Sequence, residues 1–194
     1  MDQLAKTSLH GQGPASPWVA RWSHLLPPNA QVLDIACGAG RHMKWFSDLG
    51  HQVTGIDRSP EALSEASAYG TVVLADIENA PWPLIKEQKP QQFQALVVTN
   101  YLWRPIFPVM ADCISPGGFL IYETFSDGNE TVGKPSRPDF LLKPGELLTC
   151  FPGFRTIAFE DGFLADPPRF VQRIVAQRPH AMTSPAQAPA IYRL

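Results

Sequence analysis

The amino-acid sequence predicts an α/β fold built around a mostly parallel sheet. An apolar run at 32–35 contains Asp34 and leads into a small-residue loop with two glycines, after which helix-forming residues follow. A second apolar run at 52–56 ends at Asp57, which follows Asp34 by 23 positions. Open α/β sheets bind nucleotide-like ligands where a strand, a tight glycine turn and a helix meet, with an acid at about this spacing for the ribose. These features together predict an adenosine-containing ligand.

The first half of the chain alternates between helix and strand signals. Ser16 and Pro17 begin a helix, because serine is a favoured N-cap and proline is tolerated at the first helical position. Ser59 and Pro60 begin another helix for the same reason. Apolar runs without helical spacing indicate strands between them. Strands are expected at 31–35, 52–56 and 71–74, and helices at 16–26, 41–50 and 59–70.

The second half continues this alternation and ends in a hairpin. The unbroken apolar run at 95–99 is typical of a central parallel strand. A helix containing Met110, Cys113 and Ile114 follows, and Pro116 to Gly118 is expected to form a turn before a strand at 119–124. Two final apolar runs predict an antiparallel hairpin. The hairpin strands are expected at 154–163 and 170–177, and loops at 80–92 and 126–143.

Length and composition are those of one globular domain. The chain has 194 residues, of which 44% are hydrophobic and 18% are charged. This length suits a single core, and this composition is that of a folded protein. We expect the domain to cover 16–178, with mobile segments at 1–15 and 179–194.

Charge and cysteine content exclude several classes of function. The net charge is −2 and no long basic run is present, which argues against nucleic acid as a partner. The three cysteines have neither a metal-ligand spacing nor an even disulfide count, so no metal is expected and the thiols are interpreted as reduced. No segment has the length and apolarity of a membrane span or a signal core. A cytoplasmic location is therefore expected.

The glycine loop distinguishes between two classes of adenosine ligand. A dinucleotide fingerprint has a third glycine, and this chain has Met43 at that position. The acid at Asp34 would repel a pyrophosphate but would attract a cation. S-adenosylmethionine carries a sulfonium and an ammonium group and has no phosphate. The loop therefore favours S-adenosylmethionine over NAD.

At this loop the sequence resembles the class I S-adenosylmethionine-dependent methyltransferases. Their first motif is D/E-x-G-x-G-x-G, and here it begins at Asp34 and ends at Gly40, with Ala36 in place of the first glycine. The resemblance covers about 16–178. It implies a seven-stranded Rossmann-like sheet that is mostly parallel, with an antiparallel last strand inserted beside the fifth and helices on both faces.

The chain is also similar to a smaller group of bacterial enzymes near the tellurite-resistance and thiopurine-type methyltransferases. The likeness rests on the Cys-Gly-x-Gly-Arg loop that begins at Cys37, and on a Phe…Gly-Glu-Leu turn from Phe140 to Leu147. This resemblance does not transfer a substrate.

The resemblance implies a role for the residue at the end of each strand. Asp34 would lie near the amino group of the cofactor, or else cap the next helix. Asp57 would accept both ribose hydroxyls, or else cap the helix at Ser59. Asp76 would accept from the adenine amine, or else be a turn residue. The expected cofactor-binding residues are Asp34, Ala36, Cys37, Gly38, Gly40, Asp57, Arg58, Asp76, Ile77 and Asn100.

No residue stands out in the sequence as a catalytic base. Methyl transfer to a soft or ionised nucleophile needs little more than alignment and the exclusion of water. His42 and Tyr101 are weak catalytic candidates, and the alternative for His42 is a structural role. Cys37 is interpreted as a small residue packed beneath the loop, although a cysteine at a helix start can also be a nucleophile.

The long segment at 126–143 is a candidate lid, because loops of this length are uncommon in compact domains. It carries Lys134, Arg137 and Lys143, which with Arg41 and Arg104 would form a cationic mouth for an anionic acceptor. The alternative is that these are solvated loop charges.

The sequence therefore predicts a methyltransferase that uses S-adenosylmethionine and acts on a small-molecule acceptor. A protein or RNA methyltransferase is less favoured, because the basic surface is missing and Asn-Pro-Pro-Tyr is absent at 99–103. A cofactor-binding protein without transferase activity is the other alternative.

Overall fold

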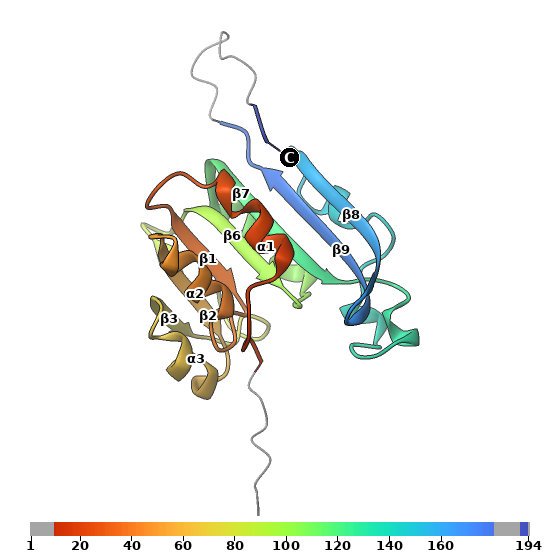
Figure 1. Ribbon diagram of the computed structural model, residues 1–194. Coiled ribbons are helices and arrows are strands. Elements are labelled where there is room, and N and C mark those ends of the chain that lie inside the picture. The colour runs from red at the N-terminus through yellow and green to blue at the C-terminus, as the bar shows by residue number, and fades with distance from the viewer. Residues whose placement is uncertain (1–9, 181–190, 194) are drawn as a thin grey trace, which may run out of the picture.

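The computed structural model describes residues 10–180 and 191–193 (Figure 1). The mobile segments expected at 1–15 and 179–194 therefore lie largely outside the described residues. No helix within the described ranges is both long and apolar enough to cross a membrane.

The centre of the molecule is a seven-stranded sheet with the order β3-β2-β1-β6-β7-β9-β8 (Figure 1). Five neighbouring strands are parallel, and β9 runs antiparallel to both β7 and β8. This order confirms the predicted sheet, including a last strand inserted beside the fifth. The strands are β1 (Gln31–Ile35), β2 (Gln52–Asp57), β3 (Thr71–Leu74), β6 (Phe93–Thr99), β7 (Ile114–Phe125), β8 (Arg155–Ala165) and β9 (Pro168–Gln177).

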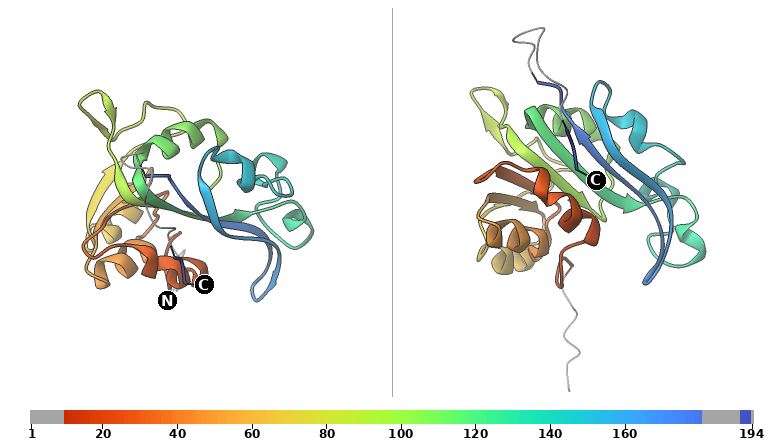
Figure 2. Two further views of the ribbon diagram at one scale, coloured as in Figure 1. Left: turned by 90° about the horizontal axis from the view of Figure 1, so that it is seen from above. Right: turned by 45° about the horizontal axis from the view of Figure 1, so that its top comes forward.

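Helices cover both faces of this sheet (Figure 2). Trp18, Phe46 and Leu63 bring α1, α2 and α3 onto one face, and Met110 and Leu147 bring α4 and α5 onto the other. The helices are α1 (Pro17–Trp22), α2 (Arg41–Asp48), α3 (Pro60–Ala66), α4 (Phe107–Cys113) and α5 (Leu147–Cys150). Short 3-10 turns are η1 (Ser23–Leu25), η2 (Arg104–Ile106), η3 (Asn129–Thr131) and η4 (Pro138–Phe140).

The two predicted Ser-Pro helix starts are present. The Ser16 hydroxyl accepts a hydrogen bond from the N–H of Trp18 at 3.1 Å, and the Ser59 hydroxyl accepts one from the N–H of Ala62 at 3.2 Å. Each serine thereby satisfies one of the free amides of its helix N-terminus. These caps fix where α1 and α3 begin, and α3 begins beside the end of β2.

Two segments differ from the sequence prediction. The expected loop at 80–92 contains a small antiparallel ribbon of β4 (Ile85–Lys86) and β5 (Lys89–Pro90). The expected turn at 116–118 lies inside β7, where the register with β6 shifts and Gly117 has a φ of +81°. A bulge can absorb proline and glycine near a strand end without ending the strand.

The close packing of α2 on β2 leads to a stability prediction at Gly55. A Cβ added there would collide with the sulfur of Met43 and lie 2.7 Å from the sulfur of Cys37, and both side chains are buried. Overpacking of this kind typically costs roughly 1–3 kcal/mol. We therefore expect Gly55→Ala to lower the free energy of unfolding by about that amount in urea titrations.

Gly162 is a matched control, because it is also a strand glycine but has no atom within 4 Å of the added Cβ. Gly162→Ala should change the free energy of unfolding by less than about 0.5 kcal/mol. Equal stability losses in the two variants would contradict the packing account.

Candidate cofactor and substrate site

A cavity opens at the carboxyl ends of the central strands. β2 lies on one side of β1 and β6 lies on the other. The strand order therefore reverses at β1, which makes this position a topological switch point. Ligands of open α/β sheets bind at such a switch point. The cavity has an outer lobe of about 860 Å³ and an inner lobe of about 610 Å³. Residues that line both lobes are His10, Ala36, Asp57, Arg58, Asn100 and Tyr101.

The structure brings together most of the expected cofactor residues. Asp76 and Ile77 line the outer lobe only, and Cys37 and Gly38 line the inner lobe only. Asp34 and Gly40 line neither lobe. Asp34 lies within β1 and is 1% exposed, and Gly40 precedes α2. These two residues can therefore act on a ligand only indirectly, through charge or through the packing of the loop.

The glycines of the loop allow close packing with other segments. Gly38 and Gly40 have φ values of +55° and +84°, a region that favours glycine. A Cβ on Gly38 would collide with the carbonyl oxygen of His10, and one on Gly40 would lie 2.9 Å from the Cβ of Ala66 in α3. The sequence assigned both glycines to ligand approach. In the structure, the missing side chain also lets the segment before α1 approach Gly38 and lets α3 approach Gly40.

Asp57 fixes the geometry of the shared region. One carboxylate oxygen accepts from the N–H of Gly38 at 2.8 Å, and the other accepts from the N–H of Ser59 at 2.9 Å. Each oxygen retains a further lone pair, so two ribose hydroxyls could still be accepted. The side chain of Ser59 is the N-cap of α3, so Asp57 is not needed in that role. Asp57 lines the wall of the cavity.

Asp76 and Ile77 form the wall of the outer lobe beyond β3. The Asp76 carboxylate accepts from the side-chain amide of Asn79 at 2.8 Å and from the N–H of Glu78 at 3.1 Å. These two hydrogen bonds lower the pKa of Asp76, so the carboxylate is ionised at neutral pH. An ionised acceptor beside a backbone turn suits the amine edge of adenine.

Asp34 is a buried carboxyl group with one oxygen that has no hydrogen-bond partner in the described part of the chain. Burial raises the pKa of Asp34 to about 8, Arg41 opposes this rise and Asp57 adds to it. A buried carboxyl with a spare oxygen favours a cation nearby, because a cation would stabilise its ionised form.

His42 is engaged in structural contacts. Its Nε2 accepts from the N–H of Ser16 at 3.1 Å, which leaves the ring proton on Nδ1, 3.4 Å from the hydroxyl of Thr99. Burial, with a contribution from Arg41, lowers the pKa of His42 to about 3. Neither nitrogen is available to a substrate, which favours the structural alternative for this residue.

The other two candidate nucleophiles or bases are uncharged at neutral pH. Burial raises the pKa of the Cys37 thiol, and Asp34 and Asp57 raise it further. Burial also raises the pKa of Tyr101, followed by Glu78. Cys37 is 3% exposed and packs beneath the loop as expected. Tyr101 lines both lobes, and its buried hydroxyl has no partner within the described ranges.

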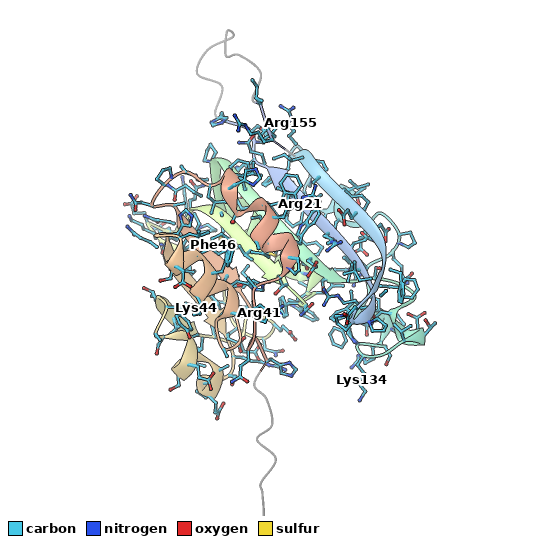
Figure 3. All side chains as sticks on the ribbon, viewed as in Figure 1. Arg21, Arg41, Lys44, Phe46, Lys134 and Arg155 are labelled. Atoms are coloured by element: carbon cyan, nitrogen blue, oxygen red, sulfur yellow. The ribbon has the colours of Figure 1, made fainter. Side chains whose placement is uncertain are left out.

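The five cations expected at a cationic mouth separate into two groups. Lys134 and Arg137 line the outer lobe and Arg41 lines the inner lobe; Figure 3 shows Arg41 below α1 and Lys134 on the loop at the lower right. Arg104 instead makes two hydrogen bonds to Glu146, at 2.6 and 2.9 Å. Lys143 pairs with Asp127 at 3.2 Å. The expectation was therefore wrong for Arg104 and Lys143, whose charges are used in ion pairs outside the cavity.

Asn129 fastens the base of the 126–143 segment. It is 1% exposed, its amide donates to the carbonyl of Pro135 at 3.0 Å, and its oxygen accepts from the N–H of Phe170 at 3.2 Å. Arg104 also donates to the carbonyl oxygens of Asp139 and Leu141. No sequence pattern indicates these anchors, because their partners are distant in the chain.

Comparisons with known proteins agree with this geometry. Residues 32–118 match the family model of a methyltransferase domain. A ubiquinone biosynthesis O-methyltransferase of Burkholderia pseudomallei (strain 1710b) is 29% identical over 126 residues, which cover 61% of this chain and 53% of that protein. The corresponding protein of Burkholderia vietnamiensis is 30% identical over 116 residues, or 56% of this chain and 49% of that protein. The chain thus spans about half the length of the curated relatives it matches.

Solved structures share the same fold. TehB from Haemophilus influenzae superposes with a TM-score of 0.67 at 18% identity, covering 82% of this chain and 61% of that one. A SAM-dependent methyltransferase from Methanosarcina mazei superposes with a TM-score of 0.66 at 15% identity, covering 87% of this chain and all of that one. Residues 32–118 therefore resemble a methyltransferase domain, and the fold of the chain is one that solved SAM-dependent methyltransferases share.

Proposed function

We propose that this protein transfers the methyl group of S-adenosylmethionine to a small-molecule acceptor by in-line displacement. The observation that carries the proposal is the pair of acids at the ends of β2 and β3, Asp57 and Asp76, which face one cavity at the switch point of the sheet. When bound, the cofactor supplies a methyl group on a positively charged sulfur. The residues of this chain bind it, orient it and exclude water.

Each part of the cofactor has a matching group in the chain. Asp57 would accept the ribose hydroxyls, and Asp76 with the N–H of Ile77 would hold the adenine edge. Asp34 would stabilise the ammonium group by charge from within β1, because it is buried and one of its oxygens has no partner in the described residues. Arg58 and Asn100 line both lobes and would flank the adenosine and the methyl group.

The remainder of the outer lobe supports a small acceptor. Its wall beyond Tyr101 combines Leu102, Phe125 and Phe140 with the cations Lys134 and Arg137. A largely apolar wall with a few polar groups is usual for small-molecule sites. The two cations favour an acceptor with a negative charge. The matched relatives, which are O-methyltransferases of ubiquinone biosynthesis, are consistent with a small acceptor.

Charge and thiol state support the remaining assignments. A protein with a net charge of −2 attracts nucleic acid poorly, so an RNA acceptor is disfavoured. The three cysteines are unpaired in the structure, which suits a reducing compartment such as the cytoplasm.

The cofactor assignment predicts selective binding in calorimetry. S-adenosylhomocysteine should bind and NAD should not. Asp57→Ala should weaken S-adenosylhomocysteine binding by about 1.5–3 kcal/mol, because charge-assisted hydrogen bonds are lost. Asp48→Ala is the control, since Asp48 is exposed and pairs with Lys44 on the outside of α2. Tight NAD binding, or equal affinities in the two variants, would refute the assignment.

The raised pKa of Asp34 predicts a pH dependence of cofactor binding. Below about pH 8 the free protein carries a proton on Asp34, whereas an ammonium ligand favours the ionised carboxylate. Binding therefore releases this proton and becomes tighter as the pH rises towards 8, by roughly 25-fold between pH 6 and pH 7.5. Calorimetry with S-adenosylhomocysteine would measure this change.

Asp34→Asn provides the control, because asparagine does not titrate. The affinity of this variant for S-adenosylhomocysteine should change little between pH 6 and pH 7.5. The raised pKa of Asp34 also affects the stability of the protein without ligand. Because the folded protein binds this proton more tightly than the unfolded chain, the free energy of unfolding should fall as the pH increases from about 4 to 8. A wild-type affinity that is flat between pH 6 and pH 7.5 would contradict the assigned environment of Asp34.

Turnover is tested by release of S-adenosylhomocysteine with a panel of thiols, phenols, amines, selenite and tellurite. If Lys134 and Arg137 attract an anionic acceptor, replacing both by alanine should raise KM for the best anionic acceptor about tenfold or more. Cofactor affinity should be nearly unchanged, because Lys134 and Arg137 line the outer lobe alone and do not reach the inner lobe formed by the glycine loop.

Lys143→Ala is the matched control, since Lys143 belongs to the same segment but pairs with Asp127 outside the cavity. Equal KM values in the double variant and the control would show that the loop charges are merely solvated. If the cofactor binds tightly and no acceptor in the panel releases product, the protein is a binding protein rather than a transferase.

A further inference from the structure

A short segment before α1, residues 10–15, lies across the cofactor loop. The N–H of Ala39 donates to the carbonyl of His10 at 2.8 Å, and the N–H of Arg41 donates to the carbonyl of Gly11 at 3.1 Å. Figure 1 shows this red segment running down from α1 towards the ends of the central strands. The segment is thus fixed to the start of α2 by two backbone hydrogen bonds.

Two glycines permit this contact. Gly11 has a φ of +82°, and a Cβ there would lie 2.8 Å from both the N of Ala39 and the carbonyl oxygen of Cys37. A Cβ on Gly38 would collide with the carbonyl of His10 from the other side. Gly13 also has a positive φ, of +95°, but an added Cβ there meets no atom within 4 Å. Gly11 therefore packs against the loop, whereas Gly13 only turns the chain.

The contact places His10 where the two lobes of the cavity join. His10 lines both lobes, together with Asn100 and Tyr101, and it is exposed to solvent. No hydrogen bond holds its ring within residues 10–180 and 191–193. His42, the other histidine of the cavity wall, has both ring nitrogens engaged. His10 is thus the imidazole at the junction whose ring nitrogens are not engaged by the described part of the chain.

We propose that His10 accepts the proton of a weakly acidic acceptor during methyl transfer, an inference that rests on the proposed function. The acceptor O–H bond breaks and its proton moves to the imidazole. The oxygen lone pair forms the bond to the methyl carbon, and the electron pair of the old carbon–sulfur bond stays on sulfur. Because His10 is exposed, the imidazolium passes its proton to solvent, and one proton is released per turnover.

This role predicts a difference between two acceptors at pH 7. The hydroxyl of 4-methylphenol is protonated, whereas the thiol of 5-thio-2-nitrobenzoate is already ionised. His10→Ala should lower turnover of the phenol about 100-fold or more and that of the thiolate by less than about threefold. A purely structural role would lower both equally. His24→Ala is the control, because His24 contacts the carbonyls of Arg21 and Arg193 away from the cavity.

A second pair of variants tests the placement of His10 without measuring activity. Gly11→Ala should increase hydrogen exchange at the amides of Ala39 and Arg41, and Gly13→Ala should not. Unchanged protection at these amides in Gly11→Ala would overturn the placement.

The outcomes separate the two proposals. If the wild-type protein turns over both probes and His10→Ala affects both equally or neither, His10 is not the base while methyl transfer stands. If the wild-type protein turns over neither probe and nothing else in the acceptor panel, the proposed function fails and the role of His10 fails with it.

Discussion

The carboxylate of Asp57 holds together the backbone segments that form the cavity. It receives the N–H of Gly38 from the loop after β1 and the N–H of Ser59 at the start of α3. Its own carbonyl receives the N–H of Ala75 after β3. One residue at the end of β2 therefore fixes the loop, the helix and the next strand relative to each other. The same carboxylate faces the cavity, so the scaffold and the proposed ribose contact depend on one group.

A second constraint is a buried polar chain that holds α1 against the end of β7. Glu123 is 1% exposed and accepts from the Ser16 hydroxyl at 2.9 Å and from Arg173 at 3.2 Å. Ser16 in turn donates its N–H to His42, which contacts Thr99 in the inner lobe. A buried carboxylate requires such partners, because an unpaired charge in the interior is costly. These buried hydrogen bonds hold the start of α1 in place and thereby position the residues that precede α1.

Local signals in the sequence predicted the individual strands and helix starts, and the resemblance to the methyltransferases implied the sheet order and much of the cavity wall. The strands were found because each is a short apolar run, and the helix starts at Ser16 and Ser59 because capping is a local interaction. Asp57 was found from its position at the end of a strand, 23 residues after Asp34, whereas the role of Asp76 was implied by the resemblance to the methyltransferases. Asp34 was found as an acid of the first motif, but its burial and the resulting rise in its pKa were not evident from the sequence.

Long-range contacts account for what the sequence did not reveal. The pairing of Arg104 with Glu146 spans 42 positions, so its charge was wrongly expected at the cavity. The anchor at Asn129 and the contact of His10 with the glycine loop likewise involve partners without a local pattern. The β4–β5 ribbon was missed because residues 80–92 combine proline, lysine and glutamine without strand alternation. Such contacts form only after the chain has folded.

The central claim is that one adenosyl ligand occupies this cavity with its ribose at Asp57. A crystal structure of the protein with S-adenosylhomocysteine tests it most directly. The account predicts ribose hydroxyls within hydrogen-bond distance of the Asp57 carboxylate, adenine beside Asp76 and Ile77, and the ammonium group on the Asp34 side of the loop. A ligand bound elsewhere, or one whose ribose makes no contact with Asp57, would contradict the account.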